Sequence, residues 1–161
     1  MKSCCFTGHR KVNVNDELKT ELRRVLTGLI EKGVTEFYAG GAVGWDMFCE
    51  KIVLDLRNEY GIHLHIIMPC PLEEQTQKWE TEQISEYKYI IGQADSVEIV
   101  SENYSKECMK NRNARLVELA DVCVCYLKNK RSGTAQTVRM AEKKGIDIIN
   151  LYTSTEIRKT S

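Results

Sequence analysis

The sequence predicts an α/β fold of the Rossmann-like, doubly wound type, with a mainly parallel sheet and helices on both faces. Two observations predict it. Short apolar, β-rich runs alternate with amphipathic helical patterns, and parallel strands need such crossovers. Three glycine-bearing segments also follow a strand pattern and precede a helix pattern, which is how α/β proteins hold phosphate. We expect one domain over residues 1–152 and a polar C-terminal tail over residues 153–161.

In the first half of the chain, caps and periodicity mark the helices. Asn13 or Asn15 can cap a helix whose apolar residues recur at helical spacing until Gly33. A second helical pattern follows a glycine-rich turn and ends before Gly61. Pro69 stops the third strand pattern. The expected strands cover residues 3–7, 35–39 and 63–68, and the second helix runs from about 46 to 60.

In the second half, residues 73–92 are polar with embedded aromatic residues and isoleucines, which indicates one or two short helices. The run 122–127 is continuously apolar, as expected of a strand covered on both faces. Gly145 can cap the last helix. We expect the first and fourth strands to be adjacent where the strand order reverses. The expected strands cover residues 96–100, 122–127 and 147–151, and the helices cover 108–120 and 134–144.

Composition narrows the functional class. The chain has 161 residues and equal numbers of basic and acidic residues, 23 of each, so no global basic field attracts nucleic acid or a membrane surface. A local basic cleft would still permit a nucleic-acid partner. No apolar run approaches the ~18 residues of a membrane span, and the apolar N-terminal stretch is too short for a signal peptide. We therefore expect a cytoplasmic protein, and a homo-oligomer is compatible with the sequence.

The cysteines and histidines do not predict a metal centre. The seven cysteines contain no C-x-x-C pair, and four of them lie inside strand patterns. We expect buried, reduced thiols rather than a zinc site. His63 and His65 share one face of a strand, which allows either structural histidines or a metal-binding pair. No third ligand is evident, and we expect no metal.

The glycine-rich turn at residues 40–46 is the strongest local signal. It is not a Walker A motif, because no Lys-Ser/Thr follows its last glycine, and it lacks the G-x-G-x-x-G spacing. Its glycines either bring backbone N–H groups to a phosphate or ribose, or only allow close strand–helix packing. Asp46 either accepts hydrogen bonds from ribose hydroxyls or caps the following helix. The candidate ligand-binding residues here are Gly40, Gly41, Ala42, Gly44 and Asp46.

The segment Thr7-Gly8-His9-Arg10 follows the first strand and suits an anion. Arg10 can hold a phosphate with two hydrogen bonds. His9 can donate a hydrogen bond or act in acid–base chemistry near neutral pH. The alternative is a solvent-facing loop with one salt bridge. We take all four residues as candidate ligand contacts, and His9 and Asp46 as candidate catalytic residues.

Two further segments complete the expected site. Ser132 or Thr134 can cap the last helix, or both can hold a phosphate together with Gly133. Basic residues in the preceding loop add positive charge. Arg112 and Asn113 either reach into the cleft at the strand ends or belong to a solvated helix face.

In this order, the motifs resemble the YpsA-like branch of the SLOG superfamily, which joins the DNA-processing protein DprA and the LOG proteins. The resemblance covers about residues 2–151. It implies a Rossmann-like fold with a nucleotide-type ligand at the strand ends, and we expect a nucleotide, ADP-ribose or a dinucleotide. The matching segments are Thr7–Arg10, Gly40–Ala42 with Gly44 and Asp46, Arg112–Asn113, and Ser132–Thr134.

The same resemblance bears on chemistry. LOG-type enzymes cleave the N-glycosidic bond of a nucleoside monophosphate with a glutamate in a Pro-Gly-Gly-x-Gly-Thr-x-x-Glu loop. Thr137 stands where that glutamate would be, and a hydroxyl cannot replace a carboxylate beside an oxocarbenium-like centre. We therefore expect a protein that binds a nucleotide-type small molecule, as a sensor or as an enzyme of undefined reaction. The alternatives are a LOG-like nucleotide hydrolase, with Asp46 as the substitute acid, and a DprA-like module for single-stranded nucleic acid.

Overall fold

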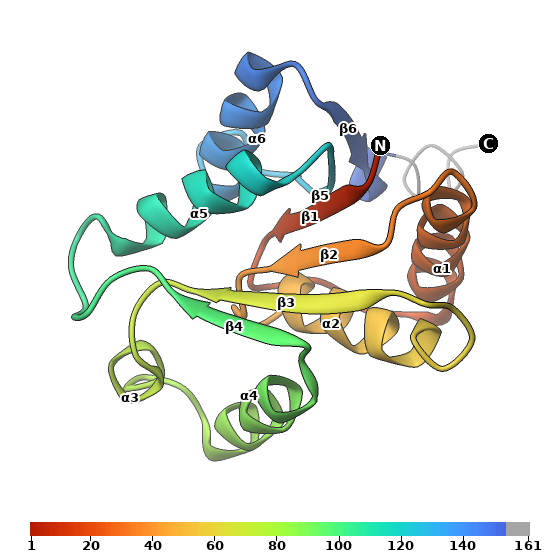
Figure 1. Ribbon diagram of the computed structural model, residues 1–161. Helices are drawn as coiled ribbons and strands as arrows, with labels where there is room; N and C mark the ends of the chain where they lie inside the picture. Colours follow the sequence, from red (N-terminus) through yellow and green to blue (C-terminus); the bar gives the residue numbers. More distant parts are fainter. Residues whose placement is uncertain (154–161) are drawn as a thin grey trace.

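The computed structural model describes residues 1–153 and confirms the predicted fold class: a six-stranded sheet with helices on both faces (Figure 1). The sheet order is β4-β3-β2-β1-β5-β6, and all neighbouring strands are parallel. The predicted tail lies, apart from Thr153, outside the described residues. The strands are β1 Ser3–Gly8, β2 Glu36–Ala39, β3 His63–Met68, β4 Ser96–Ile99, β5 Val122–Tyr126 and β6 Asp147–Asn150. The helices are α1 Asp16–Glu31, α2 Trp45–Leu56, α3 Leu72–Gln75, α4 Thr81–Gln93, α5 Cys108–Leu119 and α6 Gly133–Lys144.

The sheet separates two apolar cores because successive side chains of a strand point to opposite faces. Phe6, Phe37 and Leu64 belong to the core shared with α1, α2 and α4. Cys5 and Cys123 belong to the core under α5 and α6. Both faces of the central strands are therefore covered, which explains their continuously apolar sequences. All seven cysteines are buried and unpaired, as predicted.

The strand order corrects one prediction. β4 is not adjacent to β1; it pairs with β3 at the edge of the sheet, and β1 lies between β2 and β5. The first four strands step outward in one direction, with α1, α2 and α4 on one face, as right-handed crossovers require. The chain then returns across the opposite face through α5 (Figure 1). The order therefore reverses between β1 and β5, and the switch point lies there.

The helix boundaries follow local capping. Asn15 is the N-cap of α1, and its side-chain oxygen accepts a hydrogen bond from the Leu18 N–H at 2.8 Å. Gly145 ends α6 in the left-handed conformation, with φ of 85°. α2 ends at Leu56, earlier than predicted, because the chain continues in turns toward Gly61. Within residues 1–153, no helix has the length and apolar character that a bilayer crossing needs.

Two histidines lie at the edge of the sheet where β2 and β3 begin. The Glu36 carboxylate lies 3.1 Å from His63 Nδ1 and 2.9 Å from His65 Nε2. The second ring nitrogen of His65 lies 2.5 Å from the Ser96 hydroxyl. Among the described residues, no three histidine, cysteine or acidic side chains are arranged to hold a metal ion. Both histidines contact the Glu36 carboxylate, which joins β2 and β3.

This carboxylate gives the fold an acid-sensitive contact. Partial burial raises the pKa of Glu36, but hydrogen bonds from His65, Thr35 and His63 outweigh it and lower the pKa from 4.5 to about 2. The contact therefore stabilises the protein fully above about pH 4.5, and the stabilisation is lost as the pH falls through 2.

We predict that Glu36→Gln lowers the free energy of unfolding at pH 6 by about 1 kcal/mol or less, because the contact is near the surface. The difference from wild type should disappear near pH 2. Chemical denaturation of both proteins between pH 2 and pH 7 measures it. A constant difference over that range would contradict the assignment.

Candidate functional site

A cavity of about 260 Å³ opens at the switch point, beside the carboxyl ends of β1 and β5. We call it the switch-point cavity. Three loops and the start of α5 contribute its walls. Its lining residues are Phe6, Thr7, Gly8, His9, Arg10, Ala42, Asp46, Met109, Arg112, Asn113, Ser132, Gly133 and Thr134.

The structure thus brings together most of the residues singled out by sequence. Three of them, Gly40, Gly41 and Gly44, do not line the cavity and lie in the turn behind it. Phe6 and Met109 line it without having been predicted. Only their spacing from predicted residues could have pointed to them. Phe6 is two residues before Gly8 on β1, and Met109 is one helical turn before Arg112 and Asn113.

The glycines behind the cavity are required by close packing. Gly44 has φ of +86°, and a Cβ there would lie 2.2 Å from the Arg10 carbonyl oxygen. A Cβ on Gly41, with φ of +71°, would lie 2.3 Å from the Tyr87 hydroxyl oxygen. Gly133 differs, because nothing lies within 4 Å of its added Cβ. Packing therefore accounts for the turn, whereas the space in front of Gly133 is open.

Arg112 fixes this turn from the opposite side of the sheet. Arg112 is 6% exposed, and its guanidinium donates to the Gly40 carbonyl oxygen at 2.5 Å through Nη1. Its Nε donates to the Asn113 side-chain oxygen at 2.7 Å. A Cβ on Gly40 would lie 2.5 Å from Nη1, so only glycine allows this contact. A buried arginine stays charged, and it places positive charge directly under the cavity.

Asp46 is the acidic residue of the cavity wall. It is 6% exposed, and one of its oxygens, Oδ2, accepts from the Ala42 N–H at 3.3 Å. The other, Oδ1, is buried without a hydrogen-bond partner among the described residues. Burial raises the pKa of Asp46, and Arg112, the Ala42 N–H and Arg10 oppose it, so the pKa rises from 3.8 to about 6. Asp46 is thus a half-satisfied carboxylate facing a cavity, rather than a simple helix cap.

Glu50 follows Asp46 by one turn of α2 and was not predicted. It is completely buried, and neither carboxyl oxygen makes a full hydrogen bond to the described residues. Burial and the neighbouring Asp46 raise its pKa well above 4.5, and Arg112 and the Gly41 N–H oppose the shift. Burial therefore favours the neutral form of Glu50, and the charge of Arg112 acts on the neighbouring Asp46.

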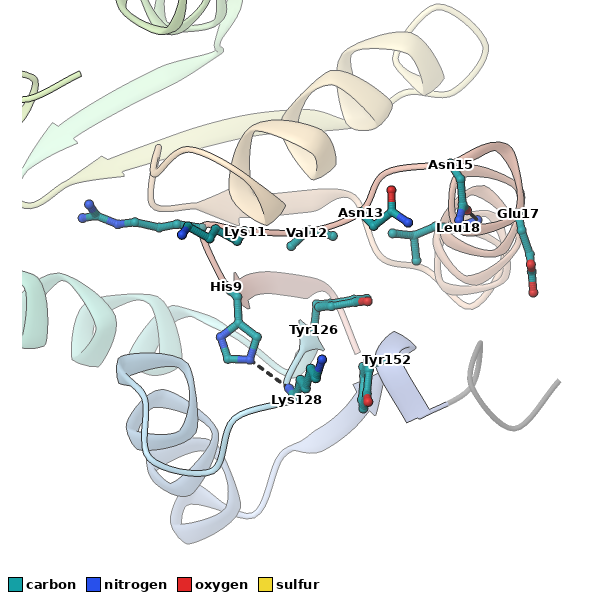
Figure 2. Close-up of a pocket in the computed structure, with 11 residues that line it drawn as sticks. His9, Lys11, Val12, Asn13, Asn15, Glu17, Leu18, Tyr126, Lys128 and Tyr152 are labelled. Carbon is teal, nitrogen blue, oxygen red and sulfur yellow. Dashed lines mark hydrogen bonds between the residues drawn. The ribbon is translucent and has the colours of Figure 1, made fainter. Parts of the chain in front are cut away.

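His9 holds two loops together. Its Nε2 accepts a hydrogen bond from the backbone N–H of Lys128 at 2.8 Å (Figure 2). It also accepts one from the backbone N–H of Asn129 at 3.0 Å. The ring proton therefore lies on Nδ1. Partial burial and then the Lys128 charge lower the pKa of His9, so the ring is neutral at pH 7. In this arrangement Nε2 is occupied, and the ring can act toward a ligand only as a donor through Nδ1.

The start of α6 forms one end of the cavity. The Ser132 hydroxyl accepts from the Ala135 N–H at 3.1 Å, so Ser132 is the N-cap. The N–H groups of Gly133 and Thr134 lie in the first turn, where no intrahelical acceptor exists. Thr137 is completely buried, and its hydroxyl donates to the Gly133 carbonyl oxygen at 3.0 Å. The position of the LOG glutamate is therefore packed inside α6 and not on the cavity wall.

Comparison with known proteins shows a family and a fold that this chain shares. The model of the YspA SLOG family matches residues 4–155. UPF0398 proteins of Bacillus thuringiensis strain Al Hakam and Bacillus cereus strain AH187 are each 26% identical over 163 residues, covering 94% of this chain and 88% of theirs.

Among solved structures, the chain is similar in fold to DNA processing protein A from Helicobacter pylori, described for its single-stranded DNA binding mode, with a TM-score of 0.66 and 18% identity. The Streptococcus pneumoniae DprA structure has a TM-score of 0.65 and 18% identity. The match covers 91% of this chain in both cases, but 63% and 49% of those chains. The chain thus spans less than two thirds of either protein.

The glycine geometry gives a matched pair of substitutions. We predict that Gly44→Ala lowers the free energy of unfolding by more than about 1 kcal/mol, because its Cβ would meet the Arg10 carbonyl at an unfavourable φ. Gly133→Ala should change it by about 0.5 kcal/mol or less, since the added methyl meets open space. Chemical denaturation measures both. Equal destabilisation by the two changes would contradict the packing argument.

The buried carboxylate predicts a distinct pH dependence. Because the pKa of Asp46 is raised from 3.8 to about 6, its contribution to stability is full below pH 3.8 and is lost as the pH rises through 6. Asp46→Asn should therefore become more stable relative to wild type between pH 4 and pH 7.5, by up to about 3 kcal/mol, since one pKa unit corresponds to roughly 1.4 kcal/mol. Thermal unfolding at the two pH values measures this, and a pH-independent difference would contradict it.

Proposed function

Because the chain belongs to the YspA SLOG family, we propose that its switch-point cavity binds a nucleotide or a nucleotide-derived phosphorylated ligand, as a sensor or as an enzyme. Family membership supports binding of nucleotides or nucleic acid in general. The observation that carries the finer proposal is the buried Oδ1 of Asp46, which has no partner among the described residues and belongs to a residue on the cavity wall. A buried acceptor of this kind needs a donor, and a ribose hydroxyl supplies one.

The proposed pose uses the two ends of the cavity. The phosphate lies at the N-terminus of α6, against the N–H groups of Gly133 and Thr134, where a helix favours negative charge. Arg10 faces the same cavity and adds a charged hydrogen bond. The ribose then lies toward Asp46, whose carboxylate accepts from its hydroxyls. The neutral His9 contributes only a donor, through Nδ1.

We predict that the wild-type protein binds AMP or GMP more tightly than the 2′,3′-dideoxy nucleotide of the same base, since the dideoxy form leaves Asp46 unpaired. Asp46→Asn should remove most of that preference, because a hydrogen bond to a charged group contributes about 1.5–3 kcal/mol. Isothermal titration calorimetry at pH 7.5 measures it. Equal wild-type affinity for the two forms would show that Asp46 does not meet the ribose.

Two substitutions test the end of the cavity where the phosphate is proposed to bind. Arg10→Ala should weaken nucleotide binding by about 1.5–3 kcal/mol and change stability little, because Arg10 is exposed. Gly133→Ala should also weaken binding, since its methyl would enter the space for the phosphate. Unchanged affinity in Arg10→Ala together with a lower melting temperature would mean that Arg10 is structural. Salt-sensitive binding of an oligothymidylate in preference to any mononucleotide would favour a DprA-like role instead.

A LOG-like hydrolase is the second candidate, favoured by the pKa of Asp46 near 6, which suits acid–base chemistry. Thr137 is buried and cannot serve, so release of adenine from AMP should be slow. Loss of about 3–4 kcal/mol of stabilisation costs two to three decades in rate. Chromatography of AMP incubated with wild type and Asp46→Asn measures base release. Fast release that survives Asp46→Asn would contradict both the slow-hydrolysis prediction and the role of Asp46.

A further inference from the structure

A second, larger cavity of about 570 Å³ lies against the loop between β1 and α1, and the proposed function does not use it (Figure 2). We call it the loop cavity. It shares two lining residues, His9 and Arg10, with the switch-point cavity, so the two spaces meet at that loop. Figure 2 shows Lys128, Tyr126 and Tyr152 on the opposite side of this space from Lys11, Val12 and Asn13.

The junction between the cavities is cationic and held in place. Arg10, Lys11 and Lys128 line the loop cavity, and Arg10 also lines the switch-point cavity. The His9 ring fixes the two loops that carry these side chains, through its bonds to the Lys128 and Asn129 N–H groups. Three cationic side chains on the wall of the loop cavity, one of them shared with the switch-point cavity, favour a second phosphate beyond the first.

The far end of the loop cavity has the opposite character. Glu17 lies in the first turn of α1 and lines the cavity there, together with Asn13 and Asn15. The Asn15 side chain is already engaged as the helix cap. A carboxylate at that position repels an anion and accepts hydrogen bonds from hydroxyl groups. The charges therefore orient a ligand with its phosphate at the junction and a hydroxyl-bearing sugar beyond it.

Aromatic rings form the remaining wall. Tyr126 and Tyr152 meet edge to face, with ring centroids 5.5 Å apart, and both line the loop cavity. Tyr126 also packs against Trp45 at 5.3 Å, which holds the ring in place. Sugar and base rings pack well on such a wall. The volume of about 570 Å³ lies within the usual range of ligand pockets, about 300–1,000 Å³, while the switch-point cavity alone falls just below it.

We propose that the loop cavity is a second subsite, and that the ligand of this protein is a diphosphate-bridged compound with a nucleoside at one end and a second sugar at the other. This inference rests on the proposed function for its first half. The nucleoside occupies the switch-point cavity, with the first phosphate at the start of α6 and Arg10. The second phosphate lies toward Lys128, and the second sugar lies against Tyr152 with its hydroxyls toward Glu17. A mononucleotide would leave the larger of the two spaces unused.

Calorimetric titration of the full chain tests the proposal with two pairs of probes, AMP against ADP-ribose and GMP against GDP-mannose. Within each pair the base and first ribose are the same, so the second half alone is compared. Lys128→Gln and Tyr152→Leu alter the loop cavity, and Asp46→Asn alters the switch-point cavity. Lys130→Gln is the matched control, because Lys130 is exposed in the same loop as Lys128 and lines neither cavity.

In one pair at least, the longer probe should bind about tenfold or more tightly than the mononucleotide, as expected from one added charged hydrogen bond. Lys128→Gln and Tyr152→Leu should remove that advantage and leave mononucleotide affinity unchanged, and Lys130→Gln should have no effect. Asp46→Asn should weaken both probes.

The contrary outcomes separate the two proposals. Equal affinity within each pair, unaffected by Lys128→Gln and Tyr152→Leu, would overturn the second subsite and leave the proposed function intact. Sensitivity of the longer probe to the loop-cavity variants without sensitivity to Asp46→Asn would overturn the nucleoside pose and retain the loop cavity. Binding of none of the four probes, or preference for an oligothymidylate over all of them, would overturn both.

Discussion

The hydrogen bond from Arg112 to the Gly40 carbonyl is the interaction on which the site depends. It joins α5, on one face of the sheet, to the turn after β2, and so ties together segments that are 72 residues apart. Glycine at position 40 leaves room for the guanidinium. The same charge lies under Asp46 and lowers its pKa against the effect of burial. Without Arg112, Asp46 on the cavity wall and Glu50 behind it would be two buried acids with no buried cation among the described residues.

The residues that destabilise the fold in this arrangement lie on α2. Asp46 and Glu50 lie one turn apart, both buried, and neither has its hydrogen-bonding capacity filled. Burial of unpaired polar groups opposes folding, so packing alone would not favour these residues. Hydrophobic contacts around them offset the cost, notably Trp45, Phe48 and Val53 in the larger core. Under the proposed function, the ligand supplies the donor that the Asp46 carboxylate lacks, and binding recovers part of this free energy.

Sequence patterns predicted the fold well because the strands are covered on both faces and the helices carry clear caps. Asn15 and Gly145 end their helices as expected. The predicted position of β4 was wrong, because local sequence patterns do not show in which direction the chain steps across a sheet. The packing of α4 on the same face as α1 and α2 determines that direction.

Sequence motifs predicted much of the cavity wall, since all residues of Thr7–Arg10 and Ser132–Thr134 line one cavity. The turn glycines illustrate the limit. A glycine in such a turn can make room either for a ligand or for a neighbouring protein atom. Only the three-dimensional contacts with Arg112, Tyr87 and the Arg10 carbonyl distinguish these two roles. Glu50 lacked any motif, since a lone acid in an amphipathic helix is indistinguishable from a surface residue until its burial is known. The loop cavity likewise depends on Tyr126 and Tyr152, which come from different strand ends.

A crystal structure of the protein with a ribonucleotide would show directly whether Asp46 meets the ribose. We expect the phosphate at the Gly133 and Thr134 N–H groups and a ribose hydroxyl within hydrogen-bonding distance of Asp46 Oδ1, with the Arg112–Gly40 contact intact. A nucleotide bound away from the switch-point cavity, or bound there with Asp46 Oδ1 still unpaired, would contradict it.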